Sequence, residues 1–184
     1  CQTLTTASED LINYKKSIDA LESQEVVFHD DFTIPGENSI PKGWKTSDGS
    51  VSRKGSLTGL SSGCRILKMT GETRDFDYGM YIRNINGTEN KGFAKYAAKE
   101  CDTILSLTPG KYTLRYIACN WNMSSFGAIT AKLSTRADSV PVFSYTVTPS
   151  CNIGNAVNNN FSGSTKVEQT FNVSTAGNYS IDFY

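Results

Sequence analysis

The chain has 184 residues, with 18 Lys and Arg against 18 Asp and Glu, one histidine and five cysteines. This length fits one domain that buries its own hydrophobic core. Zero net charge argues against a nucleic-acid partner, because phosphate binding depends on clustered cations. No apolar run approaches the roughly 20 residues that span a bilayer, so no transmembrane segment is expected. With His29 as the only histidine, sites built on paired histidines are excluded.

The N-terminus begins with Cys1, followed by small and polar residues. A bacterial lipoprotein cut before its lipid-bearing cysteine begins in this way. Two interpretations are open: a lipid anchor at Cys1, or a domain that merely starts there. The other end stops within an alternating strand, with no turn after it. This ending predicts a fragment, or a fold whose last strand is missing.

The spacing predicts one helix, over residues 6–24. It opens with a capping-box pattern from Thr6 to Glu9. An apolar stripe follows at three- to four-residue intervals: Leu11, Tyr14, Ile18 and Leu21. Because this stripe must be buried against something, we expect residues 1–25 to be a linker or docking helix.

From residue 26 onward the apolar period changes to two, which is typical of strands. The predicted strands cover 26–32, 64–70, 77–83, 103–107, 112–118, 129–133, 143–147, 167–173 and 179–183. Ser, Thr and Asn supply 54 of the 184 residues, which favours short strands joined by hydrogen-bonding loops. Residues 26–184 are therefore predicted to form an all-β fold, an antiparallel β-sandwich of the jelly-roll kind.

Two turns are predicted from proline and glycine. Pro109 and Gly110 indicate a type II turn, since proline presets φ and glycine supplies a positive φ. Pro41 and Gly43 indicate a turn that directs Trp44 toward the core. Four further cysteines are dispersed without metal-ligand spacing, and a disulfide among them is left open: Cys64, Cys101, Cys119 and Cys151.

Three stretches together match a known pattern: Asp31-Phe32 with Ile40 to Trp44, Leu107 to Leu114, and Ala176 to Ile181. They resemble the galactose-binding-like β-sandwich domains of the carbohydrate-binding-module type. Such domains occur in secreted and surface lipoproteins of glycan-degrading gut Bacteroidetes. The resemblance covers roughly residues 26–184 and implies a non-catalytic, extracytoplasmic module of a glycan-processing protein, either at the cell surface or secreted. Its partners would be an oligo- or polysaccharide and neighbouring domains of a larger chain.

Many members of that family carry a structural calcium near the join of the first and last strands. Asp30, Asp31 and Asp182 lie in the corresponding segments, so the resemblance implies them as metal ligands. Otherwise no cofactor is expected.

Sugar binding needs an exposed aromatic ring for the apolar face and polar groups that read the hydroxyls. Trp121, between the amides of Asn120 and Asn122, has this chemistry at the end of a predicted strand. Further candidates are Tyr81 and Arg83, which share one strand face, and Arg53 in a loop. For Trp121, a position that caps the core is an equal alternative.

Enzyme chemistry finds little support in the sequence. His29 has no nucleophile signature beside it, and the acidic segment from Glu72 to Asp77 contains its own arginine counterion. The main alternative to sugar binding is a structural or adhesive module whose partner is a protein, with the helix and a flat sheet face as its interface.

Overall fold

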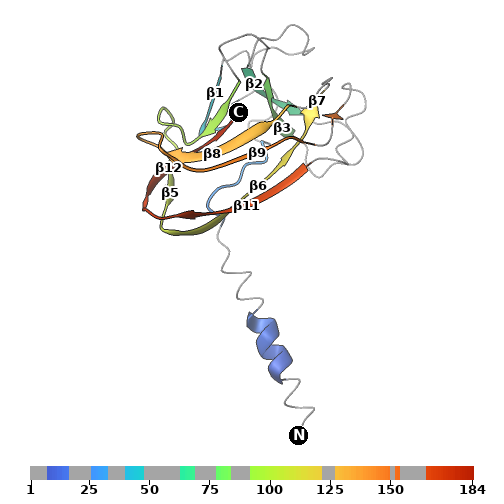
Figure 1. Cartoon of the computed structure of the whole chain (residues 1–184), viewed down its shortest axis with the longest axis vertical. Helices are drawn as coiled ribbons and strands as arrows, with labels where there is room; N and C mark the ends of the chain where they lie inside the picture. The colour runs from blue at the N-terminus through green and yellow to red at the C-terminus, as the bar shows by residue number, and fades with distance from the viewer. Residues whose placement is uncertain are drawn as a thin grey trace.

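The computed structural model describes residues 8–16, 26–32, 40–47, 63–68, 78–83, 92–121, 127–149, 152–153 and 165–184. At positions 63–68, 78, 81, 83, 121, 152 and 153 it describes the backbone alone. These residues form one helix and a set of strands that, except for one short pair, are antiparallel, which confirms the predicted all-β sandwich class (Figure 1).

The helix covers residues 8–16, inside the predicted range. All of its residues are exposed, and Leu11 and Tyr14 of the apolar stripe are 69% and 67% exposed. The other two stripe residues, Ile18 and Leu21, lie outside the described residues. The described half of the stripe is therefore not buried against the sheets.

The main sheet has the strand order β1-β4-β12-β8-β9. Its members are β1 (Trp44–Thr46), β4 (Ala94–Tyr96), β12 (Gly177–Phe183), β8 (Ile129–Thr135) and β9 (Pro141–Val147). β5 (Leu105–Leu107) pairs with the first half of β12, and β4 pairs with the second half of the same edge. One irregularity in the register, between Leu133 and Ser134, marks a β-bulge in the β8–β9 hairpin.

Three further strand pairs accompany the main sheet. β6 (Gly110–Ala118) pairs with β11 (Thr165–Val173), and β2 (Gly63–Lys68) pairs with β3 (Tyr78–Arg83). β7 (Asn120–Trp121) and β10 (Asn152–Ile153) form a short parallel pair. The β6–β11 pair faces the main sheet, because the ring of Phe171 stacks on that of Phe143 at 4.7 Å and Tyr116 meets Phe183 edge-on at 5.4 Å.

The core lies between these layers and has two parts. The larger cluster joins buried residues of several strands: Ala97, Leu105, Leu107, Leu133, Val173, Tyr179 and Ile181. The second cluster surrounds Trp44 and Ala94, with Phe28, Phe32, Met80 and Ile82 packed against them. Burying this apolar surface supplies the main driving force for the fold.

Trp44 is a core residue, as predicted, and is only 7% exposed. Its backbone N–H donates to the carbonyl of Pro41, which closes the predicted turn. Gly43 has φ of 90°, and a Cβ there would lie 2.9 Å from the ring of Tyr96. Only glycine meets both conditions without strain. The indole Nε1 donates to Asp30 Oδ2 at 2.8 Å, so the one polar atom of the ring is satisfied.

Two of the local predictions are wrong. Residues 26–32 are not a strand: Phe28 and Phe32 pack on the core, but Val26 and Val27 are exposed and the segment pairs with no described strand. Asp30 Oδ1 accepts the backbone N–H of Phe32, which has φ of 62°, so the chain turns here. Gly110 has no positive φ, because it already pairs with Val173 as the first residue of β6.

Two tyrosine corners of the same sequence pattern begin strands β6 and β12. In Thr108-Pro109-Gly110-Lys111-Tyr112, the tyrosine hydroxyl donates to the carbonyl of Thr108 at 2.9 Å. In Thr175-Ala176-Gly177-Asn178-Tyr179, the hydroxyl donates to the carbonyl of Thr175 at 2.5 Å. A tyrosine that closes a turn onto the backbone upstream is a known feature of β-sandwiches. Each hydroxyl thus holds in place the turn that precedes a long strand.

Candidate functional site

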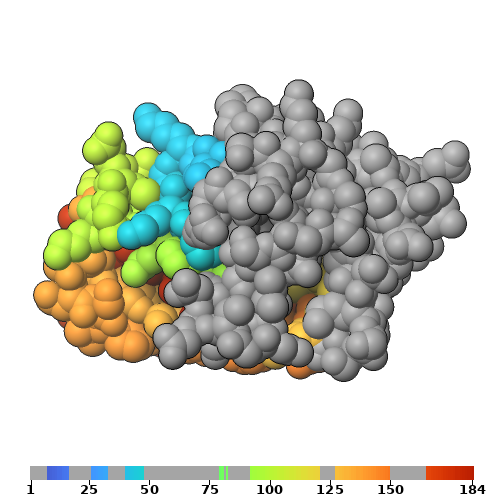
Figure 2. All heavy atoms as spheres, turned by 90° about the horizontal axis from the view of Figure 1, so that it is seen from above, coloured from blue at the N-terminus to red at the C-terminus, as the bar shows by residue number. Residues whose placement is uncertain are grey.

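A row of charged side chains crosses the solvent side of the main sheet. The strand register places Asp182 of β12 between Lys95 of β4 and Lys132 of β8. The residues before and after Asp182, Ile181 and Phe183, belong to the core side. Seen from above, the segments of β1, β4 and the β8–β9 hairpin lie next to one another on the surface (Figure 2).

Asp182 is half-buried and incompletely satisfied. Its Oδ1 is shielded from solvent and has no hydrogen-bond partner. Within the described residues, neither Lys95 nor Lys132 comes within ion-pair distance of the carboxylate. Burial raises the pKa of the Asp182 carboxyl above its ordinary value, and the two lysines oppose part of that shift by favouring the charged form. The unpartnered oxygen therefore costs the folded state free energy.

Tyr184 adds an aromatic ring beside this carboxylate. It continues β12, because its N–H and C=O exchange hydrogen bonds of 3.0 and 2.7 Å with Thr130. By strand alternation it lies on the same face as Asp182. The residue is 38% exposed, and the Lys132 ammonium lies 5.4 Å from the centroid of its ring, a cation–π contact. We name Lys95, Lys132, Asp182 and Tyr184 the Asp182 cluster.

A neighbouring ion pair fixes the far end of the row. Lys45 of β1 pairs with Lys95 in the register and donates to Glu100 Oε1 at 2.5 Å. The hydrogen bond from Lys45 is the main cause of the lowered pKa of the Glu100 carboxyl. Lys45 thus has an ion-pair partner, whereas the ammonium of Lys95 has no hydrogen bond or ion pair among the described residues.

The cluster can recognise a polar ligand that also has an apolar face. The carboxylate accepts from a hydroxyl group, the lysines donate to neighbouring oxygens, and the tyrosine ring offers a surface for C–H groups.

Of the predicted sugar-binding residues, Asn120 is the one whose side chain is described. It is 7% exposed, its Nδ2 donates to the carbonyl of Pro149 at 3.2 Å, and its Oδ1 accepts the N–H of Gly127 at 3.1 Å. Its amide therefore holds two backbone segments together inside the protein.

The other predicted residues lie outside the described side chains. Trp121 pairs with Ile153, and Tyr81 and Arg83 pair with Arg65 and Gly63, but these positions are described by backbone only. Arg53 and Asn122 are outside the described residues altogether, and so is Cys1. Neither Cys101 nor Cys119 forms a disulfide, whereas the side chains of Cys64 and Cys151 are not described.

The three predicted calcium ligands are not brought together. Both oxygens of Asp30 accept N–H groups, from Trp44 and from Phe32, and Asp31 is exposed. Asp182 lies in the lysine row instead. In the described part of the chain no three acidic, histidine or cysteine residues form a group that could hold a metal ion.

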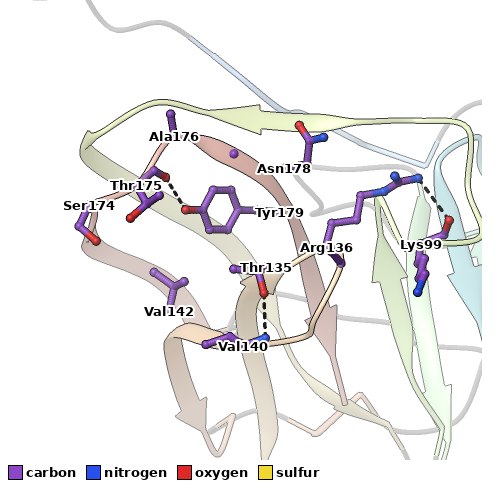
Figure 3. A pocket seen from close by; sticks show the side chains of 12 residues that line it. Lys99, Thr135, Arg136, Val140, Val142, Ser174, Thr175, Ala176, Asn178 and Tyr179 are labelled. Atoms are coloured by element: carbon purple, nitrogen blue, oxygen red, sulfur yellow. Dashed lines mark hydrogen bonds between the residues drawn. The ribbon is translucent and has the colours of Figure 1, made fainter.

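An open groove lies at the end of the sandwich, between the β8–β9 hairpin and the β11–β12 connection (Figure 3). Val140, Val142 and Ala176 form its apolar walls. Arg136 reaches away from it, because its Nη2 donates to the carbonyls of Lys99 and Cys101 at 3.3 and 2.5 Å. Tyr179 uses its hydroxyl within the turn, so the groove offers a ligand few free polar groups.

The sequence alone does not single out Lys95, Lys132 or Tyr184. The one local signal is the alternation of Ser180, Asp182 and Tyr184 with the apolar residues of β12. The lysines join this row only through the pairing of β12 with β4 and β8, which sequence periodicity does not specify.

Comparison with protein-family models, with curated proteins and with solved structures finds no match for this chain. Among the residues described, no helix is long and apolar enough to cross a membrane.

Proposed function

We propose that this chain is a non-catalytic carbohydrate-binding module of an exported or cell-surface glycan-processing protein, and that it binds a saccharide on the Asp182 cluster. The observation that carries the proposal is the half-buried Asp182 carboxylate, which lies between two lysines and beside the exposed Tyr184. The resemblance to galactose-binding-like domains supports the same class of ligand.

The ligand would bind through a few hydrogen bonds and one stacking contact. A sugar hydroxyl donates to Asp182, and Lys95 or Lys132 donates to an adjacent hydroxyl, so a pair of neighbouring hydroxyls is read together. The ring of Tyr184 packs against the C–H face of the pyranose. Such a small, open site gives weak binding, which repeated copies on a polymer strengthen.

The experiment is a glycan array with the wild-type chain, followed by titration of the best saccharide. Asp182→Asn and Tyr184→Ala should each weaken binding at least tenfold, because each removes one of the two kinds of contact. Glu168→Gln and Tyr14→Ala are matched controls, since they alter an exposed carboxylate and an exposed tyrosine elsewhere. These controls should bind within twofold of wild type.

Trp121→Ala locates the site independently. Loss of binding in Trp121→Ala, with unchanged binding in Asp182→Asn and Tyr184→Ala, would move the site to the loop after β7 and refute the cluster. If the wild-type chain binds no glycan on a broad array, the proposed function itself is refuted.

The exposed helix favours a second candidate function, a structural or adhesive module that binds a protein. Leu11, Ile12 and Tyr14 are between 51% and 69% exposed on a short helix that packs on none of the described strands. This function predicts that Leu11→Glu abolishes binding to a protein partner, while glycan binding is absent in both forms.

A further inference from the structure

Among the described strands, β9 forms an edge of the main sheet. It pairs with β8 on one side, and no described strand pairs with it on the other. The opposite edge, β1, has only three residues and includes Lys45, whereas β9 has seven. Proteins usually protect a long edge with charged residues or a cover, because its free N–H and C=O groups pair readily with another strand.

The hydrogen-bond pattern shows which groups point to this free edge. Thr130 exchanges both of its backbone bonds with Tyr184, so it faces β12 and not β9. In an antiparallel ladder, adjacent residues face opposite sides. The backbone N–H and C=O groups of the β9 residues opposite Thr130 and Lys132 therefore point away from β8, toward the edge. These residues are Thr146 and Ser144, both exposed.

The edge is free of charge over an unusual length. From Ser139 to Thr165 the sequence contains no Asp, Glu, Lys or Arg, and β9 lies within this stretch. A second copy of the same strand would therefore bring no like charges together. The β-branched and aromatic residues of β9 are also the types that pair well across strands.

Antiparallel pairing of two β9 strands is self-complementary. With a twofold axis at Tyr145, Ser144 of one copy lies opposite Thr146 of the other, and the same pair recurs on the other side of the axis. The N–H and C=O groups of these two residues then form four hydrogen bonds across the axis. The register also sets Phe143 opposite Val147, an apolar pair on the core side.

We infer that two copies of this chain associate through β9, forming one continuous antiparallel sheet across a twofold axis. The contact involves a single strand from each copy, so the association is weak. The contact lies beside the Asp182 cluster, because Ser144 of β9 is the cross-strand neighbour of Lys132. The inference does not depend on the proposed function.

The test is the mass of the full chain in solution, measured by sedimentation from about 5 µM to about 1 mM, a range that covers weak association. The wild type should shift from monomer to dimer. Ser144→Glu and Thr146→Lys should each weaken association at least tenfold, because each sets like charges close together across the axis. Thr113→Glu, on the exposed face of β6, is the control and should associate as the wild type does.

The double variant Ser144→Glu with Thr146→Lys distinguishes this register from a general effect of charge. It places opposite charges face to face twice, so association should return to the wild-type level or exceed it. A monomer throughout the range, or a dimer that neither single variant weakens, would overturn the inference. So would a double variant as weak as the singles while the thermal unfolding transition shows it to be folded.

Discussion

Tyr116 has a hydroxyl group inside the sandwich with no hydrogen-bond partner. Its ring meets Phe183 across the two layers at 5.4 Å, so the side chain contributes to packing. Burial raises the pKa of its phenol to about 12, and nearby Tyr145 adds to the shift. The ring is therefore useful to the fold, whereas the oxygen costs free energy.

Tyr116→Phe should stabilise the protein at neutral pH by about 1 kcal/mol, because it keeps the ring and removes an unsatisfied polar group. It should also change how the free energy of unfolding depends on pH in the alkaline range. An unfolded tyrosine loses its proton near pH 10, and the folded Tyr116 keeps it to about 12. Between these values the folded state binds more protons, so stability falls as the pH rises. Phenylalanine lacks this contribution.

Urea denaturation at pH 7 and pH 11 measures both effects. The variant should have the higher midpoint at pH 7, and it should lose less stability than wild type on going to pH 11. Tyr14→Phe, on the exposed helix, is the matched control and should change neither value. A lower midpoint for Tyr116→Phe at pH 7 would mean that the hydroxyl has a stabilising partner.

At the scale of strands and turns, the two tyrosine corners share a pattern but differ in burial. Tyr179 is 3% exposed and belongs to the main core, whereas Tyr112 is half-buried at the start of β6. Tyr179→Phe should cost about 1–3 kcal/mol, since it leaves the carbonyl of Thr175 without this donor. Tyr112→Phe loses two hydrogen bonds with the backbone of Thr108. It should nevertheless cost only about 0.5–1.5 kcal/mol, because water can replace both at this exposed turn. Equal midpoints in urea for the two variants would contradict this ranking by burial.

The same scale shows what the sequence could predict. Strands with several alternating residues, such as β6, β8, β11 and β12, follow from the period of two. β1 and β4 have three residues each, too few for periodicity to detect. Residues 26–32 have a strand pattern, but their phenylalanines pack on Trp44 without pairing. Pattern predicts which residues are buried better than it predicts which backbone groups pair.

The candidate site illustrates the same limit. The sequence indicates Asp182 only as a metal ligand, and it does so through the family resemblance. Its neighbours in space, Lys95 and Lys132, are 87 and 50 positions away and are brought there by the register. A cross-strand site needs the pairing of at least three strands, and local sequence does not carry that information.

At the scale of the whole molecule, the two proposals together predict avidity. Antiparallel pairing about an axis perpendicular to the sheet keeps the same face of both copies on one side, so two Asp182 clusters would point toward the same surface. A glycan polymer could then engage both, and the second contact would be intramolecular.

Wild type should bind an immobilised polymer at least tenfold more tightly than a short oligosaccharide of the same sugar. Thr146→Lys should lose that advantage, so that it binds the polymer and the oligosaccharide with equal affinity, and the charge-paired double variant should regain it. Equal affinities of the wild type for polymer and oligosaccharide, at concentrations where it is a dimer, would show that the two clusters do not act together.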